Sequence, residues 1–175
     1  MPSLIIHLAI AKRYSELHPN NISNPKEFQK GSIAPDLNSD FSRLLTKPEK
    51  AVTHYYSEPN EFQTDFNLFR QDQKVNLTDD YWKGYYAHLL ADYLFYTHYF
   101  EKEVSQSIND GTNLYDDFSI LTSKIIEDYH LKLDDDYITD AVKQYLIAKD
   151  GECKYLNYTK VHDFIEKMSM TNKHY

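Results

Sequence analysis

The amino-acid sequence predicts an all-α protein, a single-domain bundle of about six to eight helices that occupies residues 1–175. Three observations support this prediction. Apolar residues recur at spacings of three and four along most of the chain, which is the periodicity of amphipathic helices. Only four glycines and six prolines are present, which favours long elements joined by few tight turns. No internal repeat, low-complexity linker or change in composition marks a second domain.

The first helix is expected over residues 3–17, followed by a break at 18–21, where the sequence HPNN favours a turn. His7 lies at the centre of the apolar face of this helix, where a histidine is either a satisfied core residue or a metal ligand. A short second helix is expected over residues 25–29, and Lys30-Gly31 should end it. The residues on the first apolar face are Ser3, Leu4, His7, Ile10, Ala11 and Tyr14.

Residues 31–40, with the sequence GSIAPDLNSD, form a turn-rich segment between two helical patterns. Ala34 precedes a proline, which disfavours the α conformation and predicts extended backbone at that position. Such a backbone presents the Asp36 carboxylate on a fixed loop, either as a metal ligand or as the cap of a following helix. The periodicity of residues 38–58 is ambiguous, and a break is expected at Lys47-Pro48.

The remaining helices are separated by turn signals. Asn60 and Thr78 or Asp79 are suitable N-caps, and Asn109-Asp110-Gly111 marks a turn in a loop expected over residues 106–113. The last few residues of the chain are expected to be frayed. The expected helices are 61–71, 81–100, 115–130, 134–148 and 159–168.

The helix expected over residues 81–100 carries polar groups on a strongly apolar background. An α-helix turns by about 100° per residue, so His88 and Asp92, four residues apart, point in nearly the same direction. Such a pair is either a buried hydrogen bond within the core or half of a divalent-metal site. Gly84 lies one turn earlier and leaves space for a ligand or a neighbouring helix. His98 points roughly 80–120° away from the pair and is therefore a lesser candidate.

Composition excludes several kinds of function. The net charge of −8 disfavours binding to a nucleic-acid backbone, but not to a small phosphorylated substrate, because bound cations can reverse the local charge. The single cysteine, Cys153, excludes an intramolecular disulfide and a cysteine-rich zinc site. No apolar run reaches the length of a transmembrane helix, and the N-terminal residues lack the pattern of a signal peptide. We therefore expect a soluble, cytoplasmic protein of unknown oligomeric state.

The histidines and aspartates within roughly the first hundred residues form a coherent set of metal ligands. Zinc and similar divalent cations accept imidazole nitrogen and carboxylate oxygen, and a carboxylate can bridge two ions about 3.5–4 Å apart. Two ions are therefore expected. The proposed ligands are Asp36, His54, His88 and Asp92 for one ion, with Asp92 also reaching a second ion held by His7.

Four segments resemble the zinc-dependent phospholipase C family and together cover roughly the first hundred residues. They are HLAIAKRY at 7–14, GSIAPD at 31–36, THYY at 53–56 and GYYAHLLADYLFY at 84–96. The resemblance implies an all-helical fold of the phospholipase C and P1 nuclease type, in which the helices at 115–169 would complete the bundle.

The resemblance also implies a role for each matching residue. In that family the first histidine belongs to one metal of a cluster. A loop aspartate, a second histidine and a His-x-x-x-Asp pair hold another metal, with the last aspartate bridging the two. These positions correspond to His7, Asp36, His54, His88 and Asp92 in this sequence.

The sequence departs from the family pattern at the third metal. His98 falls at the spacing of a further family histidine, but the later His-x-x-x-Glu pair has no clear match. Asn113 and Asp117 have that spacing without the histidine, and His162 and Glu166 lie far downstream. His98 and Asp117 are therefore weaker candidates. The secreted lipases of the family also use an N-terminal tryptophan as a ligand, and this sequence does not match them there.

The expected function is hydrolysis of a small phosphoester by a metal-activated water, with Asp36 as the general base. A helical binding protein with a structural or degenerate metal site is the non-enzymatic alternative. An HD-type nucleotide phosphohydrolase needs an adjacent His-Asp pair, and the chain offers only His162-Asp163. A bundle whose core histidines are unconnected is a further alternative. Three tyrosines either pack in the core or line the cavity and bind substrate, namely Tyr55, Tyr85 and Tyr99.

Overall fold

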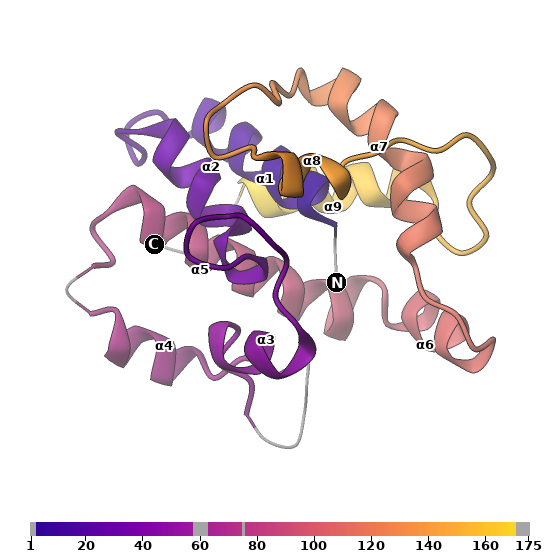
Figure 1. The fold of residues 1–175 in the computed structure, drawn as a ribbon, viewed down its shortest axis with the longest axis horizontal. Helices are drawn as coiled ribbons and strands as arrows, with labels where there is room; N and C mark the ends of the chain where they lie inside the picture. The colour runs from indigo at the N-terminus through magenta and orange to yellow at the C-terminus, as the bar shows by residue number, and fades with distance from the viewer. Residues whose placement is uncertain (1–2, 58–62, 75, 171–175) are drawn as a thin grey trace.

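The computed structural model describes residues 3–57, 63–74 and 76–170, and these residues confirm the all-α prediction (Figure 1). Within the described residues there are nine α-helices, and the strand-type pairing consists of two isolated β-bridges. A 3-10 turn, η1 (Ala34–Asp36), follows α2, and a π-helical turn, η2 (Phe95–Tyr99), follows α5. The helices are α1 (Leu4–Leu17), α2 (Pro25–Ile33), α3 (Lys47–Thr53), α4 (Phe66–Asp72), α5 (Asp80–Leu94), α6 (Glu101–Asn109), α7 (Tyr115–Tyr129), α8 (Asp140–Gln144) and α9 (Tyr158–Met170).

Helix α1 lies in the core of the fold, and every side chain from Leu4 to Ala11 is buried. Helices α2 and α5 pack against α1 and against each other, while α7 and α9 also contact α1 (Figure 1). Apolar side chains from these five helices form most of one continuous core. His7 lies within this buried stretch of α1. Among the described helices, none is both long and apolar enough to span a bilayer.

Two glycines allow α2 and α5 to cross at very short range. A Cβ atom at Gly31 would lie 1.9 Å from the backbone oxygen of Tyr81, and one at Gly84 would lie 2.0 Å from that of Phe28. Neither contact is sterically tolerable, so both positions require glycine for the helices to approach. The space expected beside Gly84 is thus filled by a neighbouring helix, and α2 is held directly over the turn of α5 that precedes His88.

The expected turn at residues 31–40 is wrong in its first half. Helix α2 continues through Gly31 to Ile33, and Ala34 has α-helical backbone angles of φ −58° and ψ −37° rather than extended ones. Its N–H donates to the backbone oxygen of Gly31, which extends the helix end into η1. Packing of α2 on α5 therefore outweighs the local preference of a residue before proline. Asp36 ends this turn and is fully enclosed.

The expected break at Lys47-Pro48 is the start of helix α3. Thr46 and Glu49 form a reciprocal capping box, in which the Thr46 N–H donates to Glu49 Oε2 over 2.8 Å. Proline in the first turn of a helix removes no intrahelical hydrogen bond, so Pro48 is compatible with this start. Helix α3 then ends at the C-cap residue His54.

The later helices differ from the prediction mainly at their ends. The helix expected over 61–71 begins at Phe66 and is capped by Asp65, while Asn60 and residues 61–62 lie outside the described residues. The helix expected over 81–100 forms α5 and η2, and α6 follows it directly, so residues 106–109 are helical rather than part of a loop. The largest error is at 134–148, where only the short helix α8 forms and Tyr145, just after it, is 50% exposed.

Candidate metal centre

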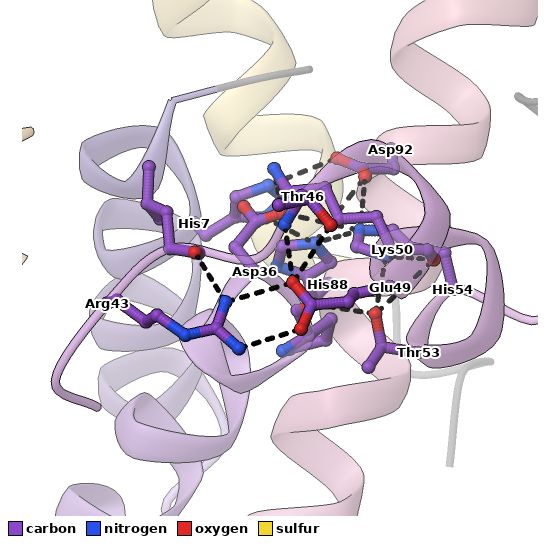
Figure 2. Close-up of polar contacts among 12 residues, drawn as sticks. His7, Asp36, Arg43, Thr46, Glu49, Lys50, Thr53, His54, His88 and Asp92 are labelled. Carbon is purple, nitrogen blue, oxygen red and sulfur yellow. Dashed lines mark hydrogen bonds and ion pairs between the residues drawn. The ribbon is translucent and has the colours of Figure 1, made fainter. Parts of the chain in front are cut away.

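Five polar residues from four separate elements converge in the core (Figure 2). None is more than 3% exposed, and no long flexible side chain contributes to the group. We refer to these five residues as the His–Asp cluster. Its members are His7 on α1, Asp36 on η1, His54 at the end of α3, and His88 and Asp92 on α5.

Two histidines of the cluster are held by backbone carbonyl groups. His88 Nδ1 lies 2.8 Å from the backbone oxygen of Ser32, and His54 Nδ1 lies 3.0 Å from that of Lys50. A carbonyl oxygen only accepts hydrogen bonds, so each Nδ1 carries the proton and each neutral ring keeps its lone pair on Nε2. The two Nε2 atoms face each other at 3.2 Å. Two ligands of one tetrahedral zinc ion are separated by about 3.3 Å.

Asp92 lies between the His7 ring on one side and the rings of His54 and His88 on the other. Its Oδ2 lies 3.3 Å from His54 Nε2 and 3.5 Å from His88 Nε2, whereas its Oδ1 lies 3.1 Å from His7 Nε2. The two carboxylate oxygens therefore point toward different nitrogen atoms. This is the arrangement of a carboxylate that can bridge two cations.

Asp36 closes the group from the side of η1. Its Oδ1 lies 3.5 Å from His54 Nε2, and its Oδ2 lies 3.9 Å from His88 Nε2. Atoms that could each ligate a metal lie within 4.8 Å of one another in two overlapping sets, one of His7, His88 and Asp92 and one of Asp36, His54 and His88. His88 is common to both sets.

The buried atoms of the cluster also show that a cation fits there. His7 Nε2 and both carboxylate oxygens of Asp92 are buried and have no hydrogen-bond partner in the described structure. Their close contacts lack hydrogen-bond geometry, and burying such atoms unpaired is costly. A divalent cation would satisfy all three at once, and imidazole nitrogen with carboxylate oxygen is a suitable donor set for zinc.

The charges of the cluster are strongly coupled. Burial lowers the pKa of His54, but the carboxylates of Asp36 and Asp92 outweigh it and raise the pKa to about 9. Burial and the neighbouring His88 lower the pKa of His7 to about 4. Burial alone would raise the pKa of Asp92, yet the surrounding histidines hold it well below its ordinary value. In the metal-free protein at neutral pH, a proton on His54 therefore compensates part of the negative charge.

Lys50 is a contact of the cluster that the sequence reasoning missed. Its Nζ lies 2.9 Å from Asp36 Oδ1, and its side chain is only 13% exposed. The signal that could have found it is its spacing, because Lys50 lies one helical turn before His54 on α3. The ring of Tyr56 also packs against His54, with their centroids 5.2 Å apart.

Neighbouring hydrogen bonds fix α3 against the rest of the site. The Thr53 hydroxyl donates to the backbone oxygen of Pro35 over 2.8 Å, and the Tyr85 hydroxyl donates to the backbone oxygen of Thr53 over 2.7 Å. Tyr85 thus positions the residue before His54. The Tyr55 hydroxyl accepts from Gln73 Nε2, and Tyr99 packs on Phe164. Neither tyrosine has a described contact with the cluster.

Three weaker candidates lie away from the cluster. His98 is exposed on η2, where Nδ1 contacts the Thr97 hydroxyl and the ring faces Tyr93. Asp117 is buried but accepts hydrogen bonds from the N–H groups of residues 154, 155 and 156 over 2.7–2.9 Å. It therefore holds the segment before α9 instead of reaching into the site. The His162-Asp163 pair is exposed on α9, away from the five cluster residues.

Comparison with known proteins agrees with this geometry. A model of the zinc-dependent phospholipase C family matches residues 4–170, nearly the whole chain and well beyond the four segments that carry the resemblance. Comparisons with curated proteins and with solved structures give no significant match.

Proposed function

Since the chain belongs to the zinc-dependent phospholipase C family, we propose that it hydrolyses a phosphoester by means of a metal-activated water. Family membership and the buried His–Asp cluster both fit a metal-binding hydrolase. The observation that carries the proposal is the arrangement of Asp92, whose two oxygens face different histidine nitrogens in a site with unpaired buried atoms.

In this proposal each residue of the cluster has a defined role. Asp36, His54, His88 and Asp92 would hold one zinc ion, and His7 together with Asp92 would hold a second. The carbonyl oxygens that accept from His54 and His88 keep their Nε2 atoms directed at the site. When bound, zinc supplies Lewis-acid polarisation and lowers the pKa of water to near neutrality.

Asp36 is the proposed general base. Burial alone would raise the pKa of its carboxyl group, but the neighbouring histidines and Lys50 hold that pKa below its ordinary value. Asp36 is therefore ionised at neutral pH and can accept a proton at a carboxylate oxygen. The buried position of the cluster excludes bulk water, which strengthens electrostatic interactions with an anionic phosphoryl group.

A second candidate function follows from the same geometry. Four protein ligands close a tetrahedral shell, and closed shells are typical of structural zinc sites. If Asp36, His54, His88 and Asp92 hold a single ion with no open position, the protein is a helical binding protein stabilised by a metal. His7 distinguishes the two readings, because a purely structural four-ligand site has no use for it.

The test combines metal analysis with hydrolysis assays on the purified, zinc-loaded protein. Phosphomonoesters, phosphodiesters and phospholipids form the substrate panel. We expect bound zinc and hydrolysis of at least one class, both lost in His88→Ala and Asp92→Asn. His98→Ala is the matched control, because it removes an exposed histidine from the same stretch of chain. Absence of divalent metal, or hydrolysis that survives both substitutions, contradicts the proposal. Zinc without hydrolysis, unaffected by His7→Asn, supports the structural site instead.

A further inference from the structure

The His–Asp cluster is enclosed by the elements that carry it. None of its five side chains is more than 3% exposed. A metal ion reaches a protein from water, so a buried metal site requires an entry path. One of the surrounding elements must therefore move aside, and these elements differ in how firmly the apolar core holds them.

Three of the elements are anchored in the core. Helix α1 buries every side chain from Leu4 to Ala11, and α5 buries every residue from Gly84 to Leu89. The turn η1 is buried along its whole length, Ala34–Asp36, and follows α2 directly. Moving any of these elements would expose apolar surface to water, which is costly.

Helix α3 is held differently. None of its seven residues, Lys47–Thr53, is buried, and Val52 is 76% exposed. None of these residues belongs to the apolar core, and the helix lies at the edge of the bundle (Figure 1). The buried ligand His54 follows as its C-cap. Detaching α3 would therefore cost little apolar burial.

Polar contacts join α3 to the rest of the site. The Thr53 hydroxyl donates to the backbone oxygen of Pro35 over 2.8 Å, and the Tyr85 hydroxyl donates to that of Thr53 over 2.7 Å. Lys50 Nζ lies 2.9 Å from Asp36 Oδ1 (Figure 2). Water can replace such contacts when the helix moves away, so the net contribution of each to holding α3 is small.

The closed arrangement is also unfavourable for the metal-free cluster. His7 Nε2 and both carboxylate oxygens of Asp92 are buried and have no hydrogen-bond partner in the described structure. Tyr55, directly after His54, has a φ of 53°, a left-handed conformation that is unfavourable for a bulky residue. Opening at α3 would admit water to the unpaired atoms and relax this backbone. A bound cation would satisfy the same atoms and so favour the closed form.

We propose that α3 is the gate of the metal centre. The metal-free protein is mostly closed, and α3 moves away transiently with His54 to admit zinc. Zinc then favours the closed form, because His54 reaches the ion only when α3 is docked. This opening is a local unfolding, so α1 and α5 stay in place. The inference rests on the metal role of the cluster proposed above, but not on hydrolysis.

Hydrogen exchange of the full chain, followed by mass spectrometry with and without zinc, tests the gate. The backbone N–H groups of Lys50, His54 and Tyr56 are hydrogen-bonded within or just after α3. We expect residues 50–56 to exchange about tenfold more slowly, or slower still, in the zinc-loaded protein. Helix α8 is the matched control, since it is also short, buries only Val142 and carries no cluster residue. Its exchange should not change.

Two tyrosine variants test the attachment of α3. Tyr85→Phe removes the donor to the backbone oxygen of Thr53. Tyr86→Phe, at the next position of α5, instead removes the hydroxyl that accepts from Arg70 on α4. We expect a chelator to extract zinc about fivefold faster from Tyr85→Phe than from wild type, the effect of one lost hydrogen bond. Tyr86→Phe should release zinc at the wild-type rate.

Each outcome decides the inference. Equal exchange of residues 50–56 with and without zinc overturns it, as does equal slowing of α3 and α8, because zinc would then stabilise the whole fold. Unfolding of the entire metal-free protein overturns it as well, and so does wild-type zinc release from Tyr85→Phe. The exchange measurement uses wild type, so it decides the inference even if Tyr85→Phe does not fold.

Failure of the gate is distinguishable from failure of the proposed function. Metal analysis precedes the exchange measurement, and a protein that binds no zinc overturns both. Bound zinc with unchanged exchange of α3 overturns the gate alone. Neither measurement involves turnover, so a lack of hydrolysis counts only against the proposed activity.

Discussion

Zinc binding to this protein should displace a proton from His54. The carboxylates of Asp36 and Asp92 outweigh the effect of burial and raise the pKa of His54 to about 9, so the ring is charged at pH 7 in the metal-free protein. Its Nε2 must lose that proton before it can ligate a metal. Zinc affinity should therefore increase as the pH rises toward 9 and level off above it.

The magnitude follows from the distance between pH 7 and that pKa. Two pKa units correspond to a loss of about 100-fold in zinc affinity at pH 7, or about 2.7 kcal/mol, relative to the plateau. His7 contributes nothing in this range, because burial and His88 lower its pKa to about 4 and it is already neutral. The two carboxylates are likewise already ionised.

Two measurements together check this prediction. Competition with a metal chelator between pH 6 and 9 gives the zinc affinity, and NMR of the metal-free protein gives the titration of the His54 ring. We expect a tenfold gain in affinity per pH unit and a ring midpoint near 9. His7→Asn should leave that ring midpoint within about one unit. A His54 ring that titrates near its ordinary value of 6.5, with a zinc affinity that is already level above pH 7, would refute the reasoning.

Three further predictions concern the framework around the site. Gly84→Ala places a methyl carbon about 2.0 Å from the backbone oxygen of Phe28, so α2 and α5 must separate. We expect a loss of about 3 kcal/mol in unfolding free energy and a reduced zinc content. Unchanged values of both would contradict the close crossing. Asp117→Ala leaves three backbone N–H groups without their acceptor. The unfolding free energy should fall by about 3 kcal/mol or more and the Tm by roughly 10 °C, while zinc binding persists. Loss of zinc from the folded variant would place Asp117 in the metal site. His98→Ala should change the unfolding free energy by less than about 0.5 kcal/mol and leave zinc content unchanged, because the ring is exposed; a drop in zinc content would reveal a third metal ligand.

The sequence predicts the helical class and the members of the cluster for physical reasons that are local. The pair His88 and Asp92 follows from helical spacing alone, and it is confirmed that both side chains point into one buried site. His7 follows from its place on an apolar face. That Asp36 and His54 join them depends on how η1 and α3 pack; their side-chain chemistry made them candidates, and the family resemblance matched both positions. Their service as metal ligands stays a prediction.

The errors arise where tertiary contacts override local preference. Ala34 is helical because α2 packs closely against α5 through Gly31 and Gly84. The preferences of neighbouring residues in the sequence cannot predict such a contact. The helix expected at 134–148 shortens to α8. Asp117, expected as a weaker metal ligand, instead accepts hydrogen bonds from N–H groups of the segment before α9. Lys50 was missed because its partner Asp36 lies on another element, and the pairing exists only once both are folded.

Anomalous X-ray scattering at the zinc edge, from crystals of the zinc-loaded protein, tests the central claim most directly. We expect one peak at ligand distances of about 2.0–2.2 Å from His54 Nε2, His88 Nε2, Asp36 and Asp92, and a second between His7 Nε2 and Asp92 Oδ1. A zinc-loaded crystal with no anomalous peak at the His–Asp cluster, or with its zinc bound only at surface residues, would contradict the account.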